Sequence, residues 1–368
     1  MRIDAVELVL VELPLVRPFR TSHGTELTKE AILVHLEGPD SHGWGECVAD
    51  RAPLYSSEFN AATWTVLSEL FVPRLLAAAD VAASDVARLL SPFKGHRMAK
   101  AALEMAVLDA ELTAAGRSFQ EYLGGEGERV APGVSVGITD TVDELVAVVA
   151  AYRAEGYGRV KLKIEPGFDL EPVRRVRAEL GDDAMLQVDA NAAYSRADAE
   201  HLARLDAFGL LLVEQPLDEE DLLGHVELAR RLATPVCLDE SILSADSARD
   251  AVALGACSVV NVKAGGVGGY LEAKAVHDTC VRLRVPVWCG GMLETGLGRA
   301  ANLALATLPG FTLPGDISAT NRYFHEDVTD PFVLEGGSIA VPRGPGLGVE
   351  VHRDALERFS TRRWRARR

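Results

Sequence analysis

Cysteines are few in this chain, and nothing in their spacing pairs them. The five thiols are odd in number, scattered and without a C-x-x-C motif, at Cys47, Cys237, Cys257, Cys280 and Cys289. This pattern argues against a disulfide framework and against a thiolate zinc site. It predicts reduced thiols in a cytosolic protein.

Long apolar runs and positive charge are also scarce. No apolar run approaches the roughly 20 residues that span a bilayer, and the N-terminus lacks the uninterrupted apolar core of a signal peptide. With 38 basic against 54 acidic residues, the net charge is −16, which argues against general binding to nucleic acid. Only the C-terminal run Arg362–Arg368 is basic. Its simplest interpretation is a solvated tail, with a contact to nucleic acid or anionic lipid as the alternative.

Aromatic residues make up only 6% of the chain, yet 48% of residues are apolar, enough to bury a large core. A length of 368 residues suits a barrel with an accessory domain. Strand-like stretches followed by helical periodicity predict an α+β capping domain over residues 1–128. The stretches are Ile3–Leu15, Ala31–Leu36 and His42–Val48, and the helical segments are Ala61–Leu76 and Met98–Ala115.

Between residues 129 and 319, short apolar runs alternate with amphipathic segments. Eight runs with seven clear helices between them predict an α/β fold, a (β/α)7β-type modified TIM barrel, and residues 320–368 are expected to complete the capping domain. The runner-up is an open doubly wound sheet, but Gly265–Gly269 does not fit the dinucleotide fingerprint. The runs are Val134–Ile138, Arg159–Ile164, Met185–Asp189, Gly209–Glu214, Pro235–Asp239, Ser258–Lys263, Pro286–Cys289 and Phe311–Pro314.

Three of these runs end on an acid: Asp189, Glu214 and Asp239, roughly 25 residues apart, or one per βα unit. Active sites of β/α barrels lie at the carboxyl ends of the strands, so these carboxylates are expected to converge. They would repel one another unless a cation lay between them, and oxygen-only ligands suit Mg²⁺ or Mn²⁺. A single acid of this kind is more simply a helix cap, but three in succession favour a metal site.

Lysines end the flanking runs. Lys161 and Lys163 are two residues apart on one predicted strand, so they share a face, and Lys263 ends the sixth run, roughly across the barrel. Bases on opposite faces of one carbon are what racemisation needs. A cation bound to a substrate carboxylate would stabilise the enediolate that forms when the α-proton leaves.

These motifs resemble those of the enolase superfamily, in its muconate-lactonizing-enzyme subgroup. The matching segments are Lys161-Leu162-Lys163, Val188-Asp189-Ala190-Asn191, Val213-Glu214-Gln215-Pro216, Leu238-Asp239-Glu240-Ser241 and Asn261-Val262-Lys263. Within the subgroup, the chain is most similar to N-succinylamino acid (N-acylamino acid) racemases that are also o-succinylbenzoate synthases. This likeness is carried by residues 18–22, 43–47, 54–58, 93–100, 290–296 and 313–316.

The resemblance implies a role for each matching residue. Asp189, Glu214 and Asp239 would bind Mg²⁺, with Mn²⁺ or Co²⁺ as substitutes, and Asn191 would support them. Lys163 and Lys263 would be the two acid/base groups, with Lys161 assisting Lys163. Arg20 would pair with a succinyl carboxylate and Tyr55 would pack against the acyl chain. Ser135, Gly291 and Met292 would line the substrate pocket.

The implied activity is a metal-dependent racemisation of N-succinyl or N-acyl amino acids. The resemblance also implies a cytoplasmic homo-oligomer, with the octamer as one candidate assembly. Dipeptide epimerases carry a second acid where this chain has Ser318, which points to an acylated rather than a free amino group. The close alternative is o-succinylbenzoate synthase, the syn dehydration of 2-succinyl-6-hydroxy-2,4-cyclohexadiene-1-carboxylate in menaquinone biosynthesis, possible in the same site. Muconate lactonisation is a third and poorer option. A catalytically inactive scaffold is also disfavoured, because it predicts the loss of a metal ligand or a lysine and none is missing.

Overall fold

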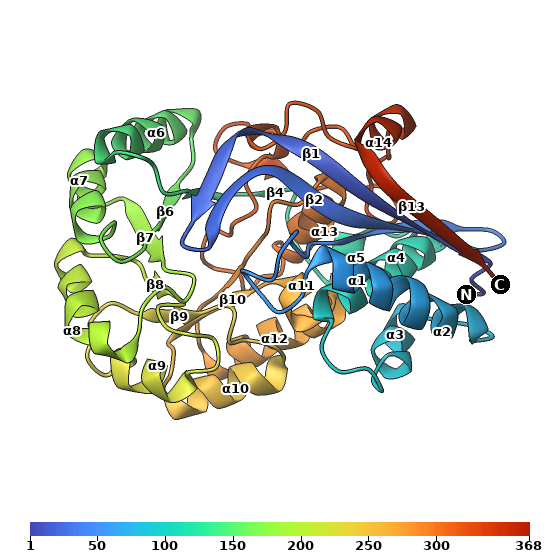
Figure 1. Ribbon diagram of the computed structural model, residues 1–368, viewed down its shortest axis with the longest axis horizontal. Helices are drawn as coiled ribbons and strands as arrows, with labels where there is room; N and C mark the ends of the chain where they lie inside the picture. Colours follow the sequence, from blue (N-terminus) through green and yellow to red (C-terminus); the bar gives the residue numbers. More distant parts are fainter.

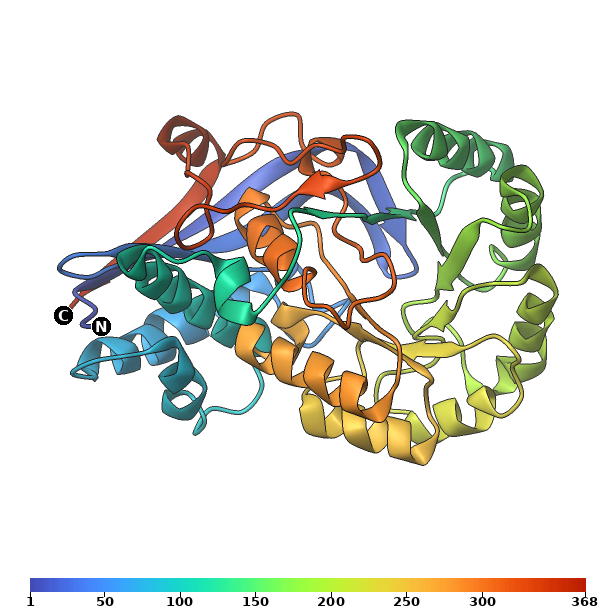
Figure 2. The same ribbon diagram turned by 180° about the vertical axis from the view of Figure 1, so that it is seen from behind.

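A computed structural model describes residues 1–368 as a curled parallel sheet wrapped by helices and a separate antiparallel sheet with its own helices (Figure 1). The second view shows the helices of the curled sheet on its outer side (Figure 2). None of the helices combines the length and apolar character that crossing a bilayer requires. The expected barrel with an α+β cap is therefore confirmed as the fold class.

The capping sheet has the order β13-β1-β2-β3 and is antiparallel. Its strands are β1 (Ala5–Thr21), β2 (Gly24–Glu37), β3 (His42–Cys47) and β13 (Ser360–Arg367), and its helices are α1 (Asn60–Val66), a π-helical turn (Leu67–Phe71), α2 (Val72–Ala77), α3 (Ala83–Leu89), α4 (Arg97–Ala115) and α5 (Phe119–Leu123). Strand β3 lies directly on α4 because Gly45 has no side chain. A Cβ there would lie 2.0 Å from the Ala102 carbonyl oxygen.

The basic C-terminal run is not a solvated tail, so that expectation is wrong. It forms β13, which pairs with β1 from Ala5↔Arg367 to Val11↔Ser360. Its cations also find partners, since Arg365 forms an ion pair with Glu37. The C-terminal run thus adds a strand to the edge of the capping sheet. Within the tail, β12 (Ile339–Ala340) pairs with β4 (Arg129–Val130).

The barrel sheet runs in chain order from β5 to β11, with every neighbouring pair parallel. Its strands are β5 (Gly133–Val136), β6 (Arg159–Lys163), β7 (Met185–Asp189), β8 (Val213–Glu214), β9 (Val236–Leu238), β10 (Val259–Val262) and β11 (Val287–Cys289). The helices of the barrel are α6 (Val142–Glu155), α7 (Leu170–Leu180), α8 (Ala199–Leu202), α9 (Leu222–Ala229), α10 (Ala245–Leu254), α11 (Ala264–Val267), α12 (Tyr270–Leu283) and α13 (Gly296–Leu305). Helix α8 lies between two 3₁₀ turns, Arg196–Asp198 and Ala203–Phe208. The tail contains a 3₁₀ turn (Thr320–Arg322) and α14 (Arg353–Phe359).

The expected eighth strand, Phe311–Pro314, does not form a ladder. It has one bridge, Phe311 to Val287, and the gap to β5 is closed by a single backbone bond from Gly133 N to Gly315 O of 2.8 Å. Pro314 has no N–H to donate, which weakens pairing at this position. The barrel therefore consists of seven hydrogen-bonded strands and one loosely attached segment.

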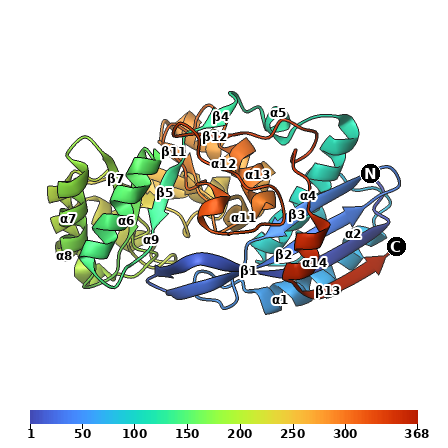
Figure 3. The same ribbon diagram turned by 90° about the horizontal axis from the view of Figure 1, so that it is seen from above.

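The hairpin of β1 and β2 places the cap over the mouth of the barrel (Figure 3). At its tip, Ser22 Oγ donates to the carbonyl oxygen of Ala190 at 3.2 Å, just after β7. The Arg20 carbonyl accepts from Ile138 N at 2.9 Å, just after β5. The carboxyl ends of two barrel strands thus hold the tip.

Candidate active site

Five strand-end residues lie at the carboxyl edge of the barrel sheet, and Lys161 lies two residues earlier on β6, opposite Gln187. Lys163 is the pairing partner of Asp189, and Asp189 is the partner of Glu214. Asp239 directly follows β9 and Lys263 directly follows β10. All of these residues except Lys263 are buried, and the side chain of Lys263 is 10% exposed.

Ion pairs link the lysines to the carboxylates. Lys161 Nζ lies 2.8 Å from both Asp189 Oδ2 and Glu214 Oε2. Lys163 Nζ lies 2.7 Å from Asp189 Oδ2 and also donates to Asn191 Oδ1. On the other side, Lys263 Nζ lies 2.6 Å from Asp239 Oδ2. Lys163 and Lys263 therefore pair with different acids of the same site.

Burial and the lysines act in opposite directions on the acids. Burial alone would raise the pKa of Asp189, but the charges of the three lysines offset this and hold it well below its usual value. Burial, with the neighbouring charge of Asp189 adding to it, raises the pKa of Glu214 to about 8 against the opposing charge of Lys161. Burial raises the pKa of Asp239 to about 6. Burial alone would lower the pKa of Lys161, but Asp189, Asp316 and Glu214 offset this and hold it well above its usual value. Lys161 is therefore a permanent cation.

The donor set fits a hard divalent cation. Three buried carboxylates supply only oxygen, as Mg²⁺ and Mn²⁺ prefer. The side chains are not arranged as a preformed three-ligand cluster, because lysine ammonium groups pair with each acid. Outer contacts also exist: Asn261 Nδ2 donates to Glu214 Oε1 at 2.7 Å, and such contacts orient ligands.

Two charged residues that the strand-end pattern missed lie beneath this layer. Asp316 pairs with Lys161 through one oxygen and, at 2.7 Å, with Arg159 Nη1 through the other. Arg159 also donates to the Pro314 carbonyl at 2.7 Å, so its guanidinium joins β6 to the eighth segment. A Cβ on Gly133 would lie 2.2 Å from Arg159 Cζ. The signal was available, since Arg159, Lys161 and Lys163 alternate along one face of β6.

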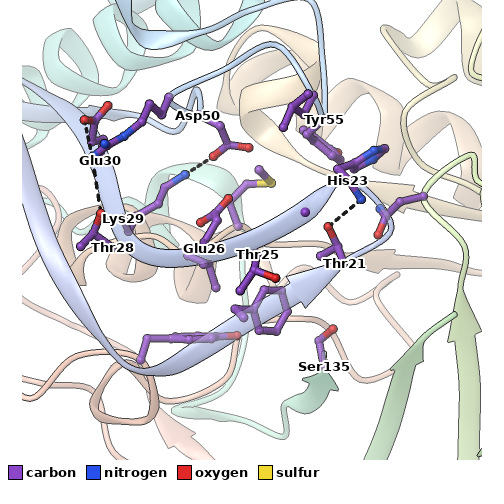
Figure 4. A pocket seen from close by; sticks show the side chains of 18 of the residues that line it. Thr21, His23, Thr25, Glu26, Thr28, Lys29, Glu30, Asp50, Tyr55 and Ser135 are labelled. Atoms are coloured by element: carbon purple, nitrogen blue, oxygen red, sulfur yellow. Dashed lines mark hydrogen bonds and ion pairs between the residues drawn. The ribbon is translucent and has the colours of Figure 1, made fainter. Parts of the chain in front are cut away.

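A cavity of about 580 Å³ opens above the lysines and extends under the β1–β2 hairpin. Figure 4 shows Lys29 pointing at Asp50, with Tyr55 and His23 close together elsewhere on the wall. The lining includes Phe19, Thr21, His23, Thr28, Lys29, Asp50, Arg51, Leu54, Tyr55, Ser135, Lys161, Lys163, Asn191, Lys263, Gly291, Met292, Leu293, Asp316 and Tyr323. The cavity therefore joins the candidate catalytic layer to the capping domain.

Not all of the residues that were expected to line the substrate pocket do so. Ser135, Gly291 and Met292 line the cavity, as does Tyr55. The hydroxyl of Tyr55 accepts from Lys263 Nζ at 2.7 Å, which was not foreseen. Arg20 does not line the cavity. Its guanidinium pairs instead with Glu165 at 2.9 Å on the outer side of the hairpin tip.

Comparison with known families agrees with this architecture. The profile of the mandelate racemase / muconate lactonizing enzyme N-terminal domain matches residues 5–124. The enolase C-terminal domain-like profile matches residues 144–355. The chain is therefore an enzyme of the enolase superfamily and belongs to its mandelate racemase / muconate lactonizing enzyme family.

Relatives within that family carry two activity names. An N-succinylamino acid racemase of Amycolatopsis sp. is 60% identical over 98% of both chains. An o-succinylbenzoate synthase of Geobacillus kaustophilus is 45% identical over 98% of this chain and 96% of its own. A crystal structure of an enolase-superfamily member from Listeria innocua superposes with a TM-score of 0.95 at 36% identity, over 100% of this chain and 99% of that one. Members of this superfamily generally use Mg²⁺.

Proposed function

We propose that the protein racemises N-succinyl or other N-acyl amino acids by moving the α-proton between Lys163 and Lys263. The observation that carries the proposal is that both ammonium groups line one cavity from strands β6 and β10, which three strands separate. The racemase name of the 60% identical relative supports it.

The chain's own residues divide the work. Asp189, Glu214 and Asp239 would hold Mg²⁺, and the ion would bind the substrate carboxylate and stabilise the negative charge that develops on it. One lysine removes the α-proton from its face, and the other lysine donates a proton to the opposite face of the planar enediolate. Lys161 stays charged beside this centre, while the cap closes the cavity to bulk water.

The pairing of Asp316 supports an acylated substrate. Arg159 and Lys161 each take one of its carboxylate oxygens, and Ser318, two residues on, carries no charge. No unpaired acid at the eighth segment is then left to bind a free α-ammonium. Lys29 and Arg51 line the cavity away from the lysine layer, but Lys29 is paired with Asp50 and Arg51 with Glu12 and Glu30.

Deuterium exchange tests this function. Each enantiomer of N-succinylphenylalanine is incubated with enzyme and Mg²⁺ in D₂O, and the α-proton is followed by NMR. Exchange from both enantiomers, lost when EDTA is added, is expected. Exchange from neither enantiomer would refute the racemase proposal.

The second candidate is o-succinylbenzoate synthase, which the 45% identical Geobacillus relatives favour. Syn dehydration needs one base on one face, and the opposite lysine would act as a cation beside the developing charge. The ratio of kcat/KM for the two substrates decides between them.

Five buried, unpaired thiols support the cytoplasm as the compartment, and size-exclusion chromatography would test the proposed homo-oligomer.

A further inference from the structure

We infer that Glu104, on the capping helix α4, is a positioning residue for Lys263 and not for Lys163. The inference rests on the two-lysine reaction proposed above. Glu104 is 3% exposed and lies outside the cavity. Its carboxylate accepts from Leu271 N at 3.0 Å, in the first turn of α12.

The segment that carries Lys263 continues directly into this contact. Lys263 is the N-cap of α11, whose first turn closes with Val267 N donating to the Lys263 carbonyl at 3.1 Å. Two glycines separate α11 from α12, and the second, Gly269, is the N-cap of α12. The carboxylate of Glu104 therefore anchors the far end of a short arm that begins at Lys263.

The arm rests on the capping domain along its length. A Cβ on Gly265 would lie 2.8 Å from Val48 Cγ2, just after β3, and a Cβ on Gly268 would lie 3.7 Å from Arg97 Cγ in α4. At the end of the arm, a Cβ on Gly269 would lie 2.3 Å from the Glu104 carboxylate. The absence of a side chain at Gly265 and Gly269 therefore leaves room for the Val48 and Glu104 side chains of the cap.

Lys163 has no such dependence on the cap. It lies inside the β6–β7 ladder opposite Asp189, and the next residue, Ile164, donates its N–H to the Asp189 carbonyl at 2.9 Å. Loss of the Glu104 contact therefore disturbs one base and spares the other. A displacement of about 1 Å is enough to cost up to 100-fold in rate.

The asymmetry has a measurable signature. A base that removes an α-proton from its own face can return a deuteron to that face, so each lysine alone supports exchange of one enantiomer. The enantiomer whose exchange disappears in Lys263→Ala defines the Lys263-dependent substrate. In Glu104→Ala, exchange of that enantiomer should fall by about 10-fold or more, and exchange of the other by less than about 3-fold. Glu104→Gln, which keeps an acceptor oxygen for one N–H, should recover most of the loss.

Asp109→Ala is the matched control. Asp109 lies on the same helix, is also buried, and accepts from Trp44 N at 2.8 Å and Leu347 N at 2.7 Å, neither of them in the arm. This variant should lower stability but leave the ratio of the two exchange rates unchanged. If Glu104→Ala does not fold, Gly269→Ala tests the same contact from the other side.

Equal losses for both enantiomers in Glu104→Ala, or no loss in either, would overturn the inference while wild-type exchange upholds the proposed function. No exchange from either enantiomer in the wild type would overturn the proposed function, and the inference with it. The two failures are therefore distinguishable in one experiment.

Discussion

Lys163 and Lys263 face the same cavity from supports of different kinds. Lys163 is inside a parallel ladder, and the neighbouring strand supplies both its pairing partner and its ion pair, Asp189. Lys263 is the first residue beyond β10, and its ammonium contacts Tyr55 from the cap as well as Asp239 from the barrel. The difference shows that the two halves of a symmetric reaction need not be supported by symmetric structure.

The largest effect is expected from removing either base. Lys163→Ala and Lys263→Ala should each lower racemisation by at least about 1,000-fold, within the range of about 100- to 10,000-fold for a positioned acid/base group. Each variant should keep exchange of one enantiomer, a different one in each case, and should keep its far-UV circular dichroism. Polarimetry and NMR measure both effects. Near-wild-type turnover in either variant would contradict the two-base assignment.

Substitution of Asp189 or Asp239, the acids paired with the two lysines, should affect Mg²⁺ binding to a similar extent, although the two lysines are supported differently. Asp189→Asn and Asp239→Asn should each weaken Mg²⁺ binding by more than about 100-fold, beyond the roughly 10–100-fold cost of changing an outer-sphere partner. Calorimetric titration measures the affinity, with the exposed Asp183→Asn as the control. An unchanged affinity in one variant would remove that acid from the ligand set.

A second buried carboxylate of the capping domain, Glu46, allows a test of how pH affects the contact between the cap and the barrel. Glu46 follows the pattern of Glu104, since it accepts from Thr295 N at 3.0 Å and Gly298 N at 2.8 Å at the start of α13. Burial raises its pKa to about 7, with Glu294 adding to the rise and the Thr295 and Gly298 donors opposing it.

Because this pKa lies above the ordinary 4.5, the folded state binds the extra proton between about pH 4.5 and 7. The free energy of unfolding contributed by Glu46 therefore falls as pH rises through that window. Relative to Glu46→Gln, the wild type should lose up to about 3 kcal/mol between pH 5 and pH 8. Urea unfolding at both pH values measures the difference, and a pH-independent difference would be inconsistent with a buried, titrating Glu46.

The smallest effect is expected at Tyr55. Tyr55→Phe removes the hydroxyl that accepts from Lys263 at 2.7 Å but keeps the ring, whose centroid lies 4.6 Å from the same ammonium. A single hydrogen bond contributes about 1 kcal/mol, so exchange of the Lys263-dependent enantiomer should fall by about 5-fold, with the other unchanged. An equal change for both enantiomers would show that Tyr55 acts on the substrate rather than on Lys263.

The strand-end layer could be predicted because two simple periods determine it. A buried parallel strand is a short, mainly apolar run, and the polar residue that ends it lies at the carboxyl edge, which is how Asp189 and Glu214 were found. The cap over the barrel followed from the change of periodicity near residue 129. These features depend on local sequence alone.

The rest depends on contacts between distant segments. Strand β13 could not be recognised, because Thr361–Arg363 is polar on both faces and only backbone pairing with β1 makes it a strand. The eighth run looked like a strand, yet Pro314 removes a ladder donor. The role of Arg20 was inferred from the family resemblance, and nothing in the sequence signalled its ion pair with Glu165, 145 residues away.

The glycine-lined seat of the Lys263 arm has a consequence for engineering stereochemical preference. Residues of α4 that face this arm are outside the cavity, so changes there need not alter which side chains the cavity accepts. A library confined to the positions around Glu104, with Gly265 and Gly269 kept, would vary the forward and reverse rates on one face of the carbon. Selection for deuterium incorporation into a single enantiomer would then yield a stereospecific exchange catalyst from a racemase.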